Sequence, residues 1–257
     1  MKLSEQFQEE IKILKGLKGK ALIQHLFQYY KWRILAILLC FVILLSAVVN
    51  AIVKKDYVLS GMLLNYTEDV SGDRLSELTS DFLAAYEINE KENTIEFITS
   101  LSYLTDDPQF ATDTYMAVEN LTARITGKML DFVVCDINSM ENLAYSEFFV
   151  DLSTVLTKEQ MEAYEPYFRY MDMAFVEKIK EIVDSENYDV EIEIPDSAKP
   201  EEMEKPIPVF IDISGSGYCD AIYPNEKDTV VLAIALNAPH EDMMQDFIDF
   251  LMEHKQK

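Results

Sequence analysis

The chain has 257 residues, of which 49% are hydrophobic, and this excludes a chain that is disordered throughout. Its net charge of -24 is unevenly distributed, because residues 1–55 carry nine Lys and Arg against three acids, which leaves 13 basic and 43 acidic residues in 56–257. Proteins bind nucleic acids largely through Lys and Arg that displace counterions, so the composition excludes nucleic-acid binding by residues 56–257.

An uncharged apolar run, ILAILLCFVILLSAVVNAIV, extends from Ile34 to Val53. Twenty residues in a helix span about 30 Å, which is the thickness of the hydrocarbon core of a bilayer. Most neighbouring Lys and Arg precede the run, and basic flanks stay in the cytoplasm. We therefore predict a single-pass protein of the cell membrane, with the bilayer as its partner along Ile34 to Val53, a cytoplasmic N-terminus and an extracytoplasmic C-terminal domain.

A cleaved secretory signal is the alternative, since Val49-Asn50-Ala51 offers small residues where a signal peptidase cuts after Ala51. The polar leader and the apolar run are both longer than a usual signal peptide has, which favours an uncleaved anchor. Residues 1–33 are basic, with apolar side chains at mostly helical spacing. This pattern predicts an amphipathic segment that lies at the membrane surface or docks a cytoplasmic protein.

Residues 54–257 show a pattern of alternating strands and helices. The first half predicts strands at Tyr57–Leu64, Thr94–Tyr103 and Met129–Cys135, with helices at 75–86 and Thr112–Thr126 between them. Strands that alternate with helices at this spacing form parallel sheets covered by helices. We therefore predict an α/β domain with a mostly parallel sheet.

The second half is predicted to be mostly helical as far as Lys205. Thr157 and Gln160 form a capping-box pair that starts a helix toward Arg169, and another helix covers 174–183. Further along we expect a strand at 189–194, a proline-rich loop at 195–208, strands at 209–213 and 229–236, and a final amphipathic helix from His240 to His254.

The residue types needed for chemistry are sparse. Cys40, Cys135 and Cys219 are too few and too scattered for a disulfide framework or a metal site, although a Cys135–Cys219 disulfide stays open. No HExxH motif or EF-hand loop is present, and His240 and His254 suggest no catalytic triad. We therefore expect no enzyme activity, no metal and no cofactor.

Several segments resemble bacterial extracellular solute-binding proteins of ABC transporters, which have the type 2 periplasmic-binding-protein fold. In that family a helix leads through a Gly into a Pro-Asp-Val strand, and an Asp-Leu-Ser segment follows. Here Gly127 leads into Leu130-Asp131-Phe132, which departs from that motif, and Asp151-Leu152-Ser153 follows. The strand from Val209 and the C-terminal helix are similar to the return of the chain to the first lobe.

The resemblance covers residues 56–156 and 206–254, and it implies one lobe of that fold. The stretch 157–205 is too short for a second α/β lobe, so we interpret it as an insertion of helix and loop that replaces a full second lobe.

In α/β sheets, ligands bind at the carboxyl ends of the strands. We therefore expect a polar solute, if one binds, to meet the side chains predicted at those ends: Asn65, Tyr66, Ser102, Tyr103, Asp136, Asn138, Asp212 and Tyr218. The function we expect is recognition by a membrane-anchored solute-binding-protein lobe that is associated with transport. The alternative is a structural or regulatory membrane subunit that acts through contacts with a protein partner. A deep pocket ringed by Tyr66, Tyr103 and Asp136 favours the first function, and a filled sheet edge with an apolar surface patch favours the second.

Overall fold

The computed structural model describes residues 19–20, 31–33, 35–46, 55–66, 72–104, 111–185, 194–223 and 228–255. The chain divides into two compact units, residues 1–54 and residues 55–257.

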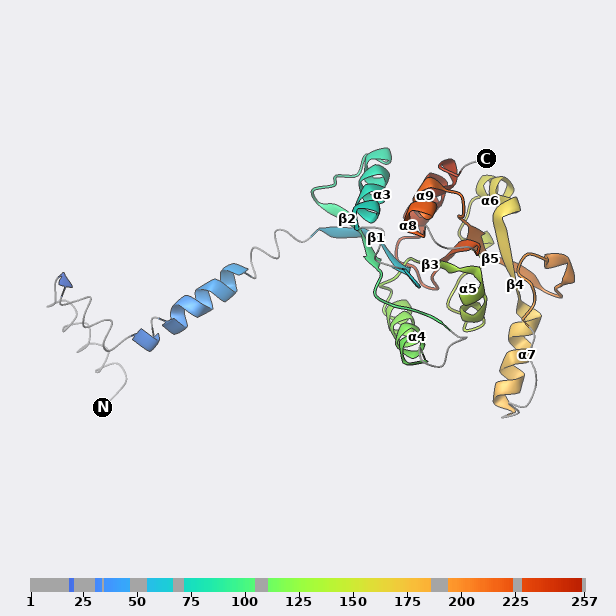
Figure 1. Ribbon diagram of the computed structural model, residues 1–257, viewed down its shortest axis with the longest axis horizontal. Helices are drawn as coiled ribbons and strands as arrows, with labels where there is room; N and C mark the ends of the chain where they lie inside the picture. The colour runs from blue at the N-terminus through green and yellow to red at the C-terminus, as the bar shows by residue number, and fades with distance from the viewer. Residues whose placement is uncertain are drawn as a thin grey trace. The chain divides into compact units, whose positions relative to one another are not determined.

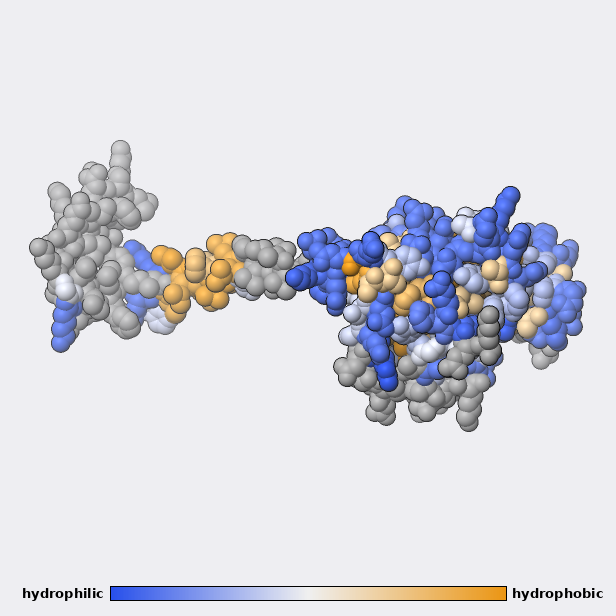
Figure 2. Space-filling model, turned by 90° about the horizontal axis from the view of Figure 1, so that it is seen from above, coloured by the Kyte–Doolittle hydropathy of each residue, from blue (hydrophilic) through white to orange (hydrophobic). Residues whose placement is uncertain are grey.

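In the first unit, residues 31–33 and 35–46 are helical, and every one of these side chains is exposed. Figure 2 shows residues 35–46 as a continuous hydrophobic stretch. Among the described residues, no helix is both long enough and apolar enough to cross a membrane. The predicted amphipathic segment is described only at residues 19–20 and 31–33, and Ile34 and residues 47–53 of the apolar run also lie outside the description.

The second unit is an α/β domain with a six-stranded sheet in the order β2-β1-β3-β6-β5-β4 (Figure 1). The strands are β1 (Asp56–Leu63), β2 (Asn93–Ile98), β3 (Phe132–Asp136), β4 (Phe168–Asp172), β5 (Pro206–Asp212) and β6 (Val230–Ile234). The α-helices are α3 (Gly72–Ala85), α4 (Ala111–Thr126), α5 (Ile137–Ala144), α6 (Lys158–Tyr164), α7 (Met173–Asp184), α8 (Gly217–Ile222) and α9 (Glu241–Glu253). Short 3-10 turns lie at Leu152–Thr154, Glu165–Tyr167 and Pro200–Glu202.

The sheet is mixed, which corrects the prediction of a mostly parallel one. Strand β1 pairs in parallel with β2 and β3, as predicted. The other three pairs, β3 with β6, β6 with β5 and β5 with β4, are antiparallel. Strand β6 is reversed because it follows α8 at one edge of the sheet and runs back between β3 and β5.

Helices cover both faces of the sheet, and side chains alternate between the two layers. Leu59 and Leu63 of β1 pack in the core under α3, α8 and α9, whereas Met62 packs in the core under α4, α5 and α7. This alternation follows from the two-residue period of a strand. Among the described residues, the members of both cores belong to the second unit, so we expect residues 55–257 to fold without the first unit.

Strands β1 and β3 approach each other closely at Gly61. A Cβ atom on Gly61 would lie 2.1 Å from Cζ of Phe132, so only glycine leaves room for that ring. The ring of Phe132 also packs against Phe247 of α9, with the ring centroids 5.1 Å apart. The missing side chain in β1 therefore allows an aromatic group of β3 to hold the C-terminal helix on the sheet.

Most of the predicted elements are confirmed, with two differences. The capping box of Thr157 and Gln160 starts α6, and α7 and α9 lie close to their predicted ranges. The helix toward Arg169 is wrong, because α6 ends at Tyr164 and residues 168–172 form the edge strand β4. Helix α8 was not predicted. Most of the predicted strand 189–194 lies outside the described residues.

Candidate functional site

The carboxyl ends of β1, β3 and β5 lie at one edge of the sheet, which we call the carboxyl edge. Strands β1 and β3 are parallel, and β5 runs in the direction of β3 because both are antiparallel to β6. In the sheet register, Asp136 of β3 lies opposite Val230, and Asp212 of β5 lies opposite the next residue, Val231. The prediction that these strand ends share an edge therefore holds for β1, β3 and β5, and also for β2, which is parallel to β1.

Asn65 is the centre of a polar cluster at this edge. Its Nδ2 donates to the carbonyl of Tyr103 at 3.0 Å and to Oδ2 of Asp136 at 2.9 Å, and its Oδ1 accepts from the amide of Tyr103 at 2.7 Å. Asn65 has a positive φ of 57°, a conformation that Asn tolerates better than most residues. The amide thus links the end of β1 to the segment after β2 and to the end of β3.

Asp136 completes the cluster as the N-cap of α5. Its Oδ1 accepts from the amide of Ser139 at 2.8 Å, and the hydroxyl of Ser139 donates to the carbonyl of Tyr103 at 3.2 Å. Burial acts to raise the pKa of Asp136, but the hydrogen bonds from Ser139, Asn65 and Cys135 outweigh it and lower the pKa below its ordinary value. The carboxylate is therefore held ionised by groups of the protein itself.

Cys135 lies beside this cluster and is not a reactive thiol. Burial, together with the neighbouring charge of Asp136, raises its pKa well above the ordinary value. Cys135 and Cys219 are both buried and free, so they form no disulfide with each other.

The remaining predicted site residues do not converge on the cluster. Tyr66 is half-buried and meets the ring of Tyr223 edge-on, with centroids 6.4 Å apart, and Ser102 is half-buried beside Tyr103. The amide of Asn138 donates to Asp228 at 2.9 Å, on the exposed surface. These residues therefore make contacts of their own apart from the Asn65 cluster, and the segments 67–71, 105–110 and 224–227, which follow Tyr66, Leu104 and Tyr223, lie outside the described residues.

Asp212 and Tyr218 belong to other contacts. Asp212 accepts from Arg169 at 2.9 Å, and Nζ of Lys255 lies 3.3 Å from its carboxylate. The hydroxyl of Tyr218 donates to Asp81 of α3 at 2.7 Å. These interactions tie β4, the C-terminal residues and α3 to the domain, so their evident role is structural.

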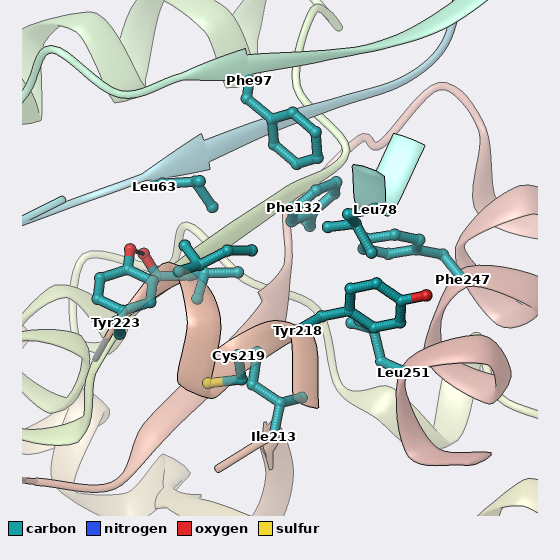
Figure 3. Close-up of a pocket in the computed structure, with 12 residues that line it drawn as sticks. Leu63, Leu78, Phe97, Phe132, Ile213, Tyr218, Cys219, Tyr223, Phe247 and Leu251 are labelled. Carbon is teal, nitrogen blue, oxygen red and sulfur yellow. Dashed lines mark hydrogen bonds between the residues drawn. The ribbon is translucent and has the colours of Figure 1, made fainter. Parts of the chain in front are cut away.

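An apolar cavity of about 20 Å³ lies below the carboxyl edge, between the sheet and helices α3, α8 and α9 (Figure 3). Leu63, Phe132, Tyr218, Tyr223 and Leu251 are among the side chains that surround it. A space of this size holds about one water-sized sphere, and an apolar cavity tends to stay dry. The cavity is therefore far smaller than the roughly 300 Å³ at which ligand pockets begin.

Tyr223 separates this cavity from the polar cluster, and sequence reasoning missed it. Its hydroxyl donates to the carbonyl of Leu64 at 2.9 Å, beside Asn65, and its ring lines the cavity. Ser139 was also missed, although an Asp three residues before a Ser at the start of a helix is a recognisable N-cap pattern. No sequence pattern could have placed Tyr223, because its partners are carbonyls distant in the chain.

The described residues include no group of three or more His, Cys, Asp or Glu side chains that could hold a metal ion. The nearest approach to an acid–base pair is at the opposite edge of the sheet, where Nδ1 of His240 lies 3.0 Å from the fully buried carboxylate of Asp131. That carboxylate also accepts from the backbone amides of Ser60 and His240, at 2.8 and 2.9 Å. Asp131 thus joins β1 and β3 to the start of α9.

No protein-family model matches the chain, and no curated protein matches it either. Among solved structures, the periplasmic binding protein AgtB from A. tumefaciens R10, in complex with agropinic acid, is similar at a TM-score of 0.33 and 12% sequence identity. The match covers 75% of this chain and 77% of that chain. This is a distant structural match, and a likeness at this level carries no argument about function.

The hydrogen bonds of Asp136 predict a pH-dependent contribution to stability. Asp136→Asn keeps an N-cap for α5 but removes the charge, so we expect it to lower the free energy of unfolding by about 1 kcal/mol at pH 7. Since the folded pKa is lowered, the contribution is complete above the ordinary pKa of about 3.9 and disappears as the pH falls through the folded value.

Urea unfolding of residues 55–257 and of this variant, at pH 7 and at about pH 3, measures the difference. The gap between the two proteins should narrow at the lower pH. A gap that is the same at both values would contradict the role given to the carboxylate charge.

Proposed function

We propose that this chain is a non-enzymatic protein, tethered to the cell membrane by residues 34–53, whose acidic domain acts through contacts with a protein partner. The observation that carries the second half of the proposal is that the polar side chains described at the carboxyl edge are paired with one another. Asn65, Tyr103, Asp136 and Ser139 hydrogen-bond one another, and the cavity beneath them is only about 20 Å³. Because these groups are already paired with one another, we expect a protein partner to bind elsewhere on the surface of the domain.

The tether is supported by the exposure of the apolar helix. Ile37, Leu38 and Leu39 follow one another at about 100° steps around the helix, yet they are 71%, 59% and 60% exposed. A helix that is apolar on all sides needs an apolar environment, which a bilayer supplies. The uncharged sequence continues beyond the described helix to Val53, and basic residues precede it, which supports a cytoplasmic N-terminus and an extracytoplasmic domain.

A second candidate function is recognition of a small polar solute at the carboxyl edge by a domain like one lobe of a solute-binding protein. The exposure of the edge favours it, since Tyr66 and Ser102 are half-buried and Asn138 is exposed. In that case a ligand would have to displace hydrogen bonds within the Asn65 cluster. Breaking each such hydrogen bond costs about 1 kcal/mol, and this cost disfavours solute binding at the edge.

The tether predicts how the protein distributes in cells. The full chain should sediment with membranes and resist extraction at alkaline pH, whereas residues 55–257 expressed alone should stay in the soluble fraction. Protease added outside intact cells should remove the domain of the full chain. A full chain that alkaline buffer releases, or a domain that external protease cannot reach, would refute the proposed topology.

A thermal-shift screen separates the two candidate functions. We expect the melting temperature of residues 55–257 to stay constant with sugars, amino acids, peptides without charge, polyamines and divalent cations, because a ligand raises it only by binding the folded state. A saturable rise that is lost in Tyr66→Ala, but kept in Tyr57→Ala at an exposed position of β1, would favour solute recognition and overturn the proposal.

A further inference from the structure

The exposed apolar side chains of the domain are concentrated around α4. Across the described part of residues 55–257, six large apolar side chains are exposed, and four of them belong to α4 or to the residues beside it: Leu104, Tyr115, Met116 and Met129. Thr114 holds Leu104 against the first turn of the helix, with its hydroxyl 2.9 Å from the carbonyl of Leu104. Such a concentration of exposed apolar groups marks an interaction surface more often than isolated residues do.

Helix α4 is apolar on its inner face and hollowed on its outer one. Ala117, Leu121 and Ile125 are buried against the sheet. On the other side an open hollow runs along the helix, lined by Tyr115, Val118, Glu119, Thr122, Ala123, Thr126 and Gly127. These residues recur at the three- and four-residue spacing of one helical face.

The hollow has large side chains at its ends and small ones in the middle. Tyr115 is 68% exposed at one end, and Met129 is 53% exposed just beyond Gly127 at the other. Between these ends the lining includes the small side chains of Thr122, Ala123 and Thr126, which project little from the helix. The distance from residue 115 to residue 127 along the helix is about 18 Å, which corresponds to about three turns of a second helix.

The charge of this surface points to a cationic partner. Glu119 is the only charged residue that lines the hollow, and its carboxylate makes no hydrogen bond or ion pair with the described residues. The basic residue of the same helix, Arg124, is bound elsewhere, to Asn120 at 2.9 Å and to Glu96 at 3.5 Å. The domain as a whole carries 13 basic and 43 acidic residues in 56–257, which attracts cations and repels anionic lipid headgroups.

We propose that the outer hollow of α4 docks a basic amphipathic helix of a partner protein. The apolar side of that helix packs on Tyr115 and Met116, and a Lys or Arg faces Glu119. The small residues in the middle let the two backbones approach each other, in the manner of helix-in-groove recognition. This inference rests on the proposed function, because it names the surface and the partner chemistry for the protein contact.

The test measures binding of a fluorescent 14-residue peptide of Leu and Lys, with the leucines on one helical face, to residues 55–257 by fluorescence anisotropy. We expect saturable binding that Glu119→Lys and Tyr115→Ala each weaken about tenfold, because the first reverses the charge that faces the Lys or Arg and the second removes a large apolar contact. Two matched variants, Glu181→Lys on the exposed side of α7 and Tyr57→Ala on β1, should change the affinity less than about twofold.

Hydrogen exchange with and without the peptide locates the contact, and protection should appear in residues 111–127. Equal weakening by Glu119→Lys and Glu181→Lys, protection outside α4, or no saturable binding would overturn the inference. These results leave the proposed function standing if no solute shifts the melting temperature, since the partner would then bind another surface. A solute that shifts the melting temperature refutes the proposed function whatever the peptide does.

Discussion

The side chain of Asn65 joins three segments that meet at the carboxyl edge of the sheet. One amide group bonds both backbone groups of Tyr103 and the carboxylate of Asp136, and Asp136 in turn caps α5 through Ser139. A buried polar group is costly unless it is paired, and here the pairing is supplied from within the chain. The described polar groups of the edge therefore satisfy one another's hydrogen bonds.

This pairing determines which parts of the domain can take part in recognition. Below the edge the aromatic rings of Phe132, Tyr218 and Tyr223 fill the layer under α3, α8 and α9, apart from a small dry cavity. Figure 2 shows that one face of the domain is mostly hydrophilic, and residues 56–257 carry 43 acidic against 13 basic residues. The exposed apolar groups near α4 stand out against this background.

The sequence predicted local structure well where the periodicity was strong and the elements were long. The continuous apolar run of β1 indicates a strand buried on both faces, and the helical spacing of α9 identifies its buried face, so these elements could be predicted closely. Strand β4 and helix α8 have only five and six residues, too few to show a period. The reversed direction of β6 could not be predicted, because strand order is set by tertiary packing and not by local pattern.

The sequence could predict where the polar side chains of the candidate site gather, but not whether they bond to one another or face a ligand. Asn65, Tyr103 and Asp136 were expected to gather at one edge because parallel strands end together, and they do. Whether such side chains face a ligand or each other depends on distances of a few tenths of an ångström, which composition does not encode. Asp212 and Tyr218 were assigned to the same site by their strand ends, but Arg169, Lys255 and Asp81 are closer partners.

Amide hydrogen exchange of residues 55–257 without ligand tests the pairing at the carboxyl edge most directly. The amide of Tyr103, which donates to Asn65, and that of Ser139, which donates to Asp136, should exchange within about tenfold of the β3 amides, because they open only with the sheet. Exchange of these two amides that is orders of magnitude faster, with β3 still protected, would contradict the account. The edge would then open on its own, and solute recognition would become the better explanation.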